Sequence, residues 1–244
     1  MATPARKMVA IALAAAACAL VPGTASAGVV VSASGPSASS FPVGRKLGDS
    51  ERIVLRAGDT LTVLDGNGTR VLRGAGTFSL GQQGGPSRRS TFAVLTERRS
   101  AQRVRTGAVR GEAEGESLAP PNLWYVDISQ PGRTCLADTE RVRLWRGSAE
   151  GDAQYTLHGS AGGGKTVRFS DGEIMAPWDL VALPVTEGAE YRVAAGDGSN
   201  AGSISFVVLA NVSDEPEELA AQLIENGCTR QLELLSSAMM VAES

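Results

Sequence analysis

Residues Gly159 to Thr166 match the phosphate-binding pattern of a glycine, four residues and Gly-Lys-Thr. In nucleotide-binding proteins this pattern precedes a helix, because the loop amides and the helix N-terminus hold the phosphates together. Here the run from Thr166 to Phe169 alternates apolar and polar residues, which predicts a strand. We therefore expect a hairpin loop without a nucleotide.

His158 precedes this loop and is the single histidine of the chain. A metal site built on several imidazoles, or a Ser-His-Asp triad, would have to depend on it. No Gly-x-Ser-x-Gly elbow accompanies it. We interpret His158 as a strand-edge residue, and we expect no metal and no cofactor.

Acidic pairs such as Asp171 with Glu173, or Asp179 with Glu187, have the residue types that glycoside hydrolysis requires. Catalytic carboxyls must also face each other across a cleft at about 5–10 Å, which a sequence does not define. We therefore assign no catalytic residue and expect a non-catalytic protein.

The aromatic candidates for ligand contact are Trp124, Trp145 and Trp178, the three tryptophans of the chain. Exposed in a row, they would form a sugar-stacking platform. Buried, each would stabilise a core by roughly 1.5–3 kcal/mol. We favour the core interpretation because large aromatic side chains usually bury most of their surface.

These tryptophans belong to residues 122–212, where short alternating runs are separated by Pro-Gly, Asp-Gly and Glu-Gly pairs. That pattern predicts an antiparallel β-sandwich, with Trp124, Val126 and Ile128 on one face of its first strand. Residues 28–82 alternate around Asp65-Gly66-Asn67-Gly68, a strong hairpin signal, and predict a small β meander.

The first 27 residues have the composition of a cleavable secretory signal peptide. Arg6 and Lys7 precede the apolar run 8–21 and the small residues Ala25-Ser26-Ala27. No later stretch is long and apolar enough to span a membrane. We therefore expect a periplasmic or secreted protein; lipidation at Cys18 is the lesser alternative, because no large aliphatic residue stands three positions earlier.

The mature chain keeps Cys135 and Cys228, which predict one disulfide in an oxidising compartment, with two free thiols as the alternative. It would close a loop of 93 residues (228 − 135) at the edge of the β domain. The formal net charge of −3 produces no global field that would favour nucleic acid.

Residues 83–121 form an arginine-rich linker that we expect to be partly helical, with Phe92 and Leu95 on its apolar face and Ser90 or Thr91 as its cap. The arginines could contact an anionic surface or form a solvated helix face, and we favour the second interpretation. The candidates for anionic contact are Arg88, Arg89, Arg98, Arg99, Arg103 and Arg105.

Residues 213–244 predict two helices that pack against the sandwich and are held there by Cys228. Ser213 or Asp214 is the expected cap of the first helix, and Gly227 is its expected stop.

The N-terminal β region resembles the periplasmic region of FecR-type proteins. The resemblance lies in Arg56 to Leu64, in Gly66 and Gly68, and in Gly74 to Phe78. In that family the region supports contacts between a signalling protein and an outer-membrane transporter. This chain has a signal peptide in place of the family's cytoplasmic anti-sigma segment and membrane helix, so the resemblance implies only a protein-contact role.

The whole chain also resembles exported alphaproteobacterial proteins of unassigned function, in Arg105 to Gly111 and in Leu223 to Cys228. We therefore expect a mainly β, exported, non-catalytic interaction module. Its partner would be another envelope protein, with no integral membrane segment remaining after signal cleavage. A carbohydrate-binding or polysaccharide-acting protein is the alternative.

Overall fold

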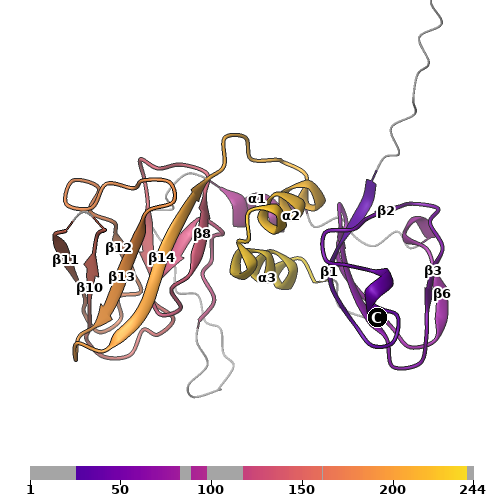
Figure 1. The fold of residues 1–244 in the computed structure, drawn as a ribbon, viewed down its shortest axis with the longest axis horizontal. Helices are drawn as coiled ribbons and strands as arrows, with labels where there is room; N and C mark the ends of the chain where they lie inside the picture. The colour runs from indigo at the N-terminus through magenta and orange to yellow at the C-terminus, as the bar shows by residue number, and fades with distance from the viewer. Residues whose placement is uncertain (1–25, 83–88, 98–117, 161, 241–244) are drawn as a thin grey trace, which may run out of the picture.

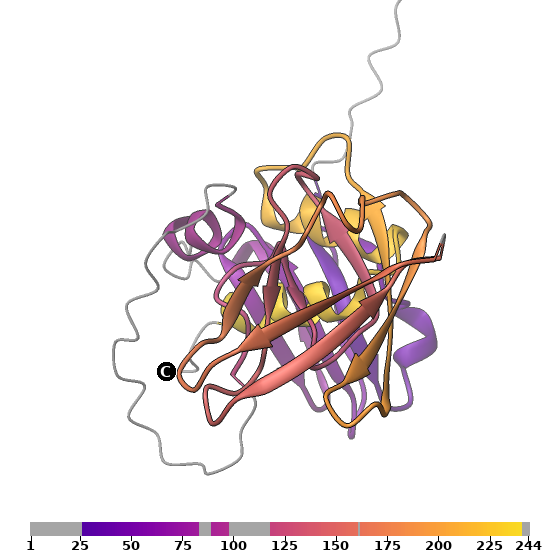
Figure 2. The same ribbon diagram turned by 90° about the vertical axis from the view of Figure 1, so that its left-hand side faces the viewer.

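The computed structural model describes residues 26–82, 89–97, 118–160 and 162–240. The protein is mainly β, with a pair of C-terminal helices, as the sequence predicted. Three helices lie between two β units (Figure 1), and in the view along the long axis the sandwich faces the viewer with the C-terminal helices and the N-terminal strands behind it (Figure 2). The predicted signal peptide lies outside the described residues up to residue 25.

The N-terminal unit is built from two small sheets around one apolar core. A four-stranded antiparallel sheet in the order β2-β1-β4-β5 faces the two-stranded sheet β3-β6. The core residues include Val30, Leu47, Ile53 and Val63. The elements are β1 (Ser26–Ser34), η1 (Ala38–Ser40), β2 (Lys46–Gly48), β3 (Ile53–Leu55), β4 (Thr60–Asp65), β5 (Gly68–Arg73), β6 (Gly76–Phe78) and η2 (Leu80–Gln82).

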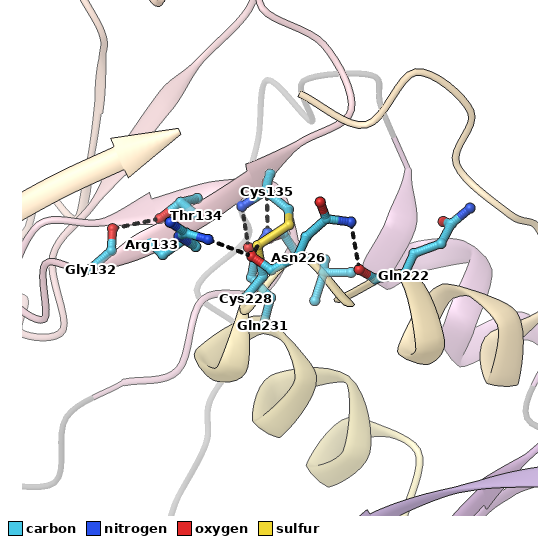
Figure 3. The surroundings of a disulfide bond; sticks show 9 residues. Gly132, Arg133, Thr134, Cys135, Gln222, Asn226, Cys228 and Gln231 are labelled. Atoms are coloured by element: carbon cyan, nitrogen blue, oxygen red, sulfur yellow. Dashed lines mark hydrogen bonds between the residues drawn. A yellow bond between two sulfur atoms is a disulfide. The ribbon is translucent and has the colours of Figure 1, made fainter. Parts of the chain in front are cut away.

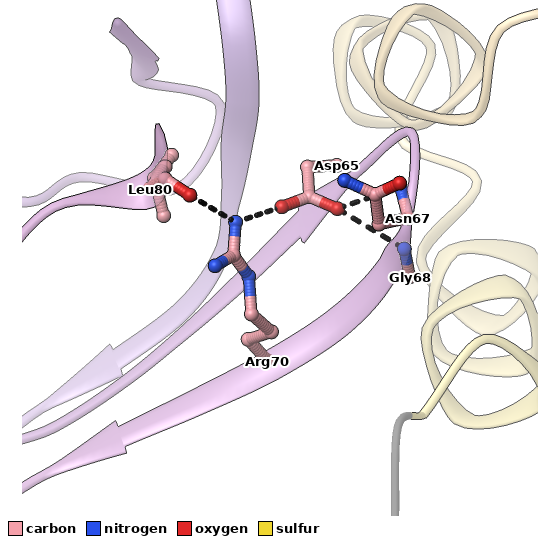
Figure 4. A network of polar contacts seen from close by, with 5 residues as sticks. All are labelled: Asp65, Asn67, Gly68, Arg70 and Leu80. Carbon is pink, nitrogen blue, oxygen red and sulfur yellow. Dashed lines mark hydrogen bonds and ion pairs between the residues drawn. The ribbon is translucent and has the colours of Figure 1, made fainter. Parts of the chain in front are cut away.

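Asp65 organises the hairpin turn that joins β4 to β5 (Figure 4). One carboxylate oxygen accepts the backbone N–H groups of Asn67 and Gly68 at 2.8 and 3.1 Å. The other pairs with Arg70, whose guanidinium also donates to the Leu80 carbonyl at 3.1 Å. The buried Asp65 carboxylate therefore fixes the turn that the Asp-Gly-Asn-Gly sequence predicted, and Arg70 compensates its charge.

The C-terminal unit is a sandwich of a five-stranded sheet, β11-β10-β13-β14-β8, and a three-stranded sheet, β12-β9-β7. Phe169, Tyr191 and Phe206 belong to the core cluster of this unit, together with Trp178. The strands are β7 (Tyr125–Asp127), β8 (Arg133–Leu136), β9 (Arg143–Trp145), β10 (Ala153–His158), β11 (Gly164–Phe169), β12 (Met175–Pro177), β13 (Glu190–Ala195) and β14 (Asn200–Val208).

Two strand pairs in the sandwich are parallel, although the sequence pattern predicted an antiparallel domain. β8 pairs with β14 in parallel, and β7 pairs with β9 in parallel. The alternation of apolar residues reports which face of a strand is buried and carries no information on the direction of its neighbour. The short strands β8 and β12 were not predicted either, since neither shows a sustained alternation.

The helical layer consists of α1 (Arg89–Thr96), α2 (Pro216–Glu225) and α3 (Thr229–Ala238). The C-terminal pair packs against the sandwich, as predicted, and its apolar residues also contact the N-terminal unit, because they belong to a cluster shared with both β units. Leu219, Leu223 and Leu235 join Val29 and Leu64 of the N-terminal unit in this cluster. The sandwich side contributes Leu123, Trp124, Cys135 and Leu209.

The expected cap of α2 is displaced by one or two residues, because Glu215 occupies the N-cap and Pro216 the first helical position. Ser213, two residues before the N-cap, forms hydrogen bonds to the N-cap residue and to the first turn of the helix. Its hydroxyl accepts the Glu215 N–H at 3.1 Å and donates to the Glu218 carboxylate at 2.8 Å.

The α2–α3 junction is fastened to β8, the edge strand of the five-stranded sheet (Figure 3). Cys135 of β8 and Cys228, which precedes α3, form a fully buried disulfide. Buried Gln231 completes the attachment: its side-chain oxygen accepts the Cys135 N–H at 2.6 Å, and its amide donates to the carbonyls of Cys135 and Leu123, both at 2.8 Å. Covalent and polar contacts therefore fix α3 at one end.

We predict that removing the disulfide destabilises the whole protein. Closing a loop of 93 residues stabilises the folded state by about 4–5 kcal/mol in the loop-entropy model. In urea unfolding, the free energy of unfolding of the double variant Cys135→Ala, Cys228→Ala should be lower than that of the wild type by an amount of that order. Reductant should lower the unfolding midpoint of the wild type to that of the variant and leave the midpoint of the variant unchanged. A wild-type midpoint that does not change with reductant would contradict the prediction.

Candidate functional site

The glycine-rich loop joins two antiparallel strands, as predicted, and no helix follows it. β10 pairs with β11, and Leu157 lies opposite Lys165 while His158 lies opposite Gly164. The Lys165 ammonium forms an ion pair with Asp179 at 2.9 Å. The lysine is thus directed to a neighbouring carboxylate, and the loop lacks the helix N-terminus that a phosphate site of this type requires.

The acidic pairs considered from the sequence organise loops. Asp171 accepts the Gly151 N–H at 2.7 Å, and Glu173 accepts the Ser170 N–H at 2.8 Å. Glu187 is exposed. Within the described ranges, no group of three or more histidine, cysteine or acidic side chains is placed to hold a metal ion.

All three tryptophans are buried, so they form no exposed sugar-stacking platform. Their exposed fractions are 8% for Trp124, 3% for Trp145 and 4% for Trp178. Each indole N–H donates to a backbone carbonyl, as buried tryptophans usually do. The bonds run from Trp124 to Thr96 (2.9 Å), from Trp145 to Leu118 (3.0 Å) and from Trp178 to Leu183 (2.7 Å).

Trp124 also corrects our prediction for the first strand of the sandwich. It does not share a face with Val126 and Ile128, because β7 begins only at Tyr125. Val126 and Ile128 enter the sandwich core, whereas Trp124 enters the cluster of the helical layer.

The start of the sandwich satisfies the last carbonyls of α1, which have no partner within the helix, and the carbonyl of Glu97 just past it. The Leu123 N–H donates to the Leu95 carbonyl at 2.8 Å. The Asn122 side chain donates to the Glu97 carbonyl at 2.9 Å, and the Trp124 indole donates to Thr96 between them. These three bonds hold α1 in a fixed place beside the sandwich.

The arginine-rich linker is helical over α1, where Phe92 and Leu95 are buried as predicted. Of the predicted anionic-contact residues, Arg88, Arg98, Arg99, Arg103 and Arg105 lie outside the described residues, and of Arg89 only the backbone is described. Contact of these arginines with an anionic surface stays a prediction.

A shallow apolar groove runs between α1 and α3, and we call it the α1–α3 groove. Val94, with 66% of its surface exposed, and Leu234 stand on its two helical walls. Its volume is about 620 Å³. The lining residues are Ser90, Thr91, Val94, Leu95, Ala119, Pro120, Pro121, Leu234, Ser237 and Ala238.

A second hollow of about 320 Å³ adjoins the groove, and we call it the Tyr125 pocket. It shares Ala119, Pro120, Leu234 and Ser237 with the groove. The remaining lining comes from the segment before β7, from β7 and the loop after it, from β8 and from the first turns of α3. These residues are Leu118, Leu123, Tyr125, Asp127, Gln130, Arg133, Thr134, Arg230, Gln231 and Glu233.

Burial changes the acid–base properties of two groups in the Tyr125 pocket. Desolvation raises the pKa of the Asp127 carboxyl above its ordinary value, against the opposing effects of the Ser129 N–H and the charge of Arg230. Desolvation also raises the pKa of the Tyr125 hydroxyl, and the charge of Arg143 opposes that shift. At neutral pH the tyrosine is therefore a neutral hydrogen-bonding group.

None of the helices in the described residues has the length and apolarity needed to cross a membrane. Comparison of the chain with protein-family models, curated proteins and solved structures finds no match. The FecR-like and alphaproteobacterial resemblances therefore stay predictions.

The residues that line the two hollows were missed by sequence reasoning. Tyr125, Arg133, Arg230 and Gln231 carry no motif that indicates a ligand. Pro120 and Pro121 were interpreted as the end of the linker, although they form one wall of the groove. The one usable signal was Cys228, because a disulfide to Cys135 places the first turn of α3 beside β8.

We predict that Asp127→Asn stabilises the protein at neutral pH. Because the folded-state pKa is raised, the folded chain disfavours the carboxylate, and stability falls as pH rises from the ordinary value of 3.8 through the raised value. The asparagine keeps an oxygen for the Ser129 N–H, which donates to Asp127 at 2.9 Å. Urea unfolding should show a more stable variant at neutral pH and equal stabilities well below the ordinary pKa; a less stable variant at neutral pH would contradict the assignment.

Proposed function

We propose that this chain is an exported, non-catalytic interaction module that binds another envelope protein in the α1–α3 groove. The observation that carries the proposal is an exposed apolar surface on a rigid support. Val94 and Leu118, two of the large apolar side chains that the fold leaves exposed, stand at the groove and at the adjoining pocket. Exposed apolar residues grouped along a hollow are typical of protein interaction sites.

The support of the groove favours a specific interaction. α1 is held by the three bonds from residues 122–124, and α3 is held by the disulfide and by Gln231. A preformed surface loses little conformational entropy on binding, so that more of the contact energy contributes to affinity. The partner segment that suits this groove is apolar, since both helical walls present aliphatic side chains.

Export would place the module in an oxidising compartment where its disulfide persists, because reducing compartments keep cysteine thiols reduced. The alternative, a carbohydrate-binding protein acting through the tryptophans, loses its support because all three rings are buried. Hydrolysis by a carboxylate pair is likewise less supported, because Asp171 and Glu173 are engaged with backbone groups of loops.

Site-specific photo-crosslinking in the native host tests the proposal. A photoreactive amino acid at Val94 should yield a discrete protein adduct in the cell envelope. The matched control is Val181, which is 94% exposed on the sandwich and lines neither hollow. A probe there should yield no such adduct.

A second variant separates contact from proximity. Val94→Asp places a charge on the groove wall and should abolish capture of the cross-linked partner by the purified protein, while Val181→Asp should not. The proposal fails if position 94 yields no adduct, or if positions 94 and 181 yield the same adducts.

A further inference from the structure

We propose that the Tyr125 pocket binds a saccharide unit, by stacking a sugar ring on Tyr125 and hydrogen-bonding its hydroxyls to the surrounding planar polar side chains. This site is distinct from the tryptophans considered from the sequence. It also goes beyond protein binding in the α1–α3 groove.

Tyr125 is a half-buried ring with a rigid backing. It stacks on Trp145, with ring centroids 6.4 Å apart and planes inclined by 23°. Trp145 is itself fixed, because it is buried and its indole donates to the Leu118 carbonyl. The Tyr125 ring, which lines the hollow, is therefore held in place, and it supplies the apolar aromatic surface on which a sugar ring can stack.

The polar lining has the composition that recognises hydroxyl groups. The side chains are the carboxylates of Asp127 and Glu233, the amide of Gln130 and the guanidinium groups of Arg133 and Arg230. Each is planar and offers two or more acceptors or donors, so neighbouring sugar hydroxyls can be bound in pairs. Both signs of charge are present, which suits a hydroxyl that donates to one group and accepts from the next.

The two arginines keep most of their N–H donors unused within the described part of the protein. Arg230 donates to the Gln130 amide oxygen, and Arg133 donates to the Asn226 carbonyl at 3.3 Å. Within the described part of the chain, neither arginine forms an ion pair. A guanidinium has five N–H donors, so both residues keep donors free for a ligand.

The charge and the size of the hollow favour a sugar over other ligand classes. Two acidic side chains beside the two arginines disfavour a phosphate or a nucleotide, because like charges repel. The volume of about 320 Å³ lies at the small end of ligand pockets, which span roughly 300–1,000 Å³. A short saccharide segment suits that size, and the neighbouring groove is the more apolar of the two surfaces.

Isothermal titration calorimetry of the purified chain with three defined probes tests the inference. The probes are the tetramers of glucose, N-acetylglucosamine and galacturonic acid, which differ in charge and substituent. We expect saturable binding of at least one of them. Tyr125→Ala should weaken that binding by about tenfold, the loss of one ring contact, whereas Tyr125→Phe should retain most of it.

Matched surface variants keep the test decisive if Tyr125→Ala fails to fold. Arg230 and Gln130 form an exposed hydrogen-bonded pair in the pocket, and Arg168 and Gln154 form the same kind of pair on the sandwich. Arg230→Ala and Gln130→Ala should weaken binding severalfold, while Arg168→Ala and Gln154→Ala should not. The inference is overturned if none of the three tetramers binds saturably, or if the pocket variants bind as the wild type does. Because no partner protein is present, either result leaves the crosslinking test at Val94 unaffected.

Discussion

The fold depends on one apolar cluster that both β units and the three helices share. Neither β unit closes its own surface at this boundary: Val29 and Leu64 emerge from one side, Leu123 and Leu209 from the other, and the leucines of α2 and α3 fill the space between them. At roughly 25 cal/mol per Å² of apolar surface, such a layer stabilises both units at once. The apolar side chains of the helices therefore form one core that both β units share.

Two attachments keep the helical layer in register with its neighbours. At one end the disulfide and Gln231 fasten α3 to the edge strand β8. At the other end the backbone N–H of Thr69 in β5 donates to the carbonyl of Met239, just past α3, at 2.8 Å. The α1–α3 groove and the Tyr125 pocket both lie along the helix that these attachments fix. A partner or ligand would thus meet a surface whose shape is set before binding.

Much of the architecture could be predicted from local patterns, because strand alternation, the hairpin glycines and the cysteine pair are local or countable features. The burial of Trp145 and Trp178 and the edge position of Cys135 followed from the same reasoning. The direction of strand pairing could not be predicted, since β7 and β9 are parallel through contacts distant in sequence. The two hollows were not predictable either. They arise where residues 118–134 approach α3, and none of Tyr125, Arg133 or Arg230 carries a motif that announces a ligand.

The central claim, that the helical layer couples the two β units, is tested most directly by the variant Leu64→Ala. Leu64 is fully buried in β4, while every tryptophan lies on the other side of the layer or within it. Loss of a buried leucine costs about 2–5 kcal/mol. The free energy of unfolding, measured in urea by tryptophan fluorescence, should then fall by that amount. The fluorescence transition should coincide with the transition seen by circular dichroism. A fluorescence transition that stays at the wild-type midpoint, while circular dichroism reports an earlier loss of structure, would show that the two units fold independently.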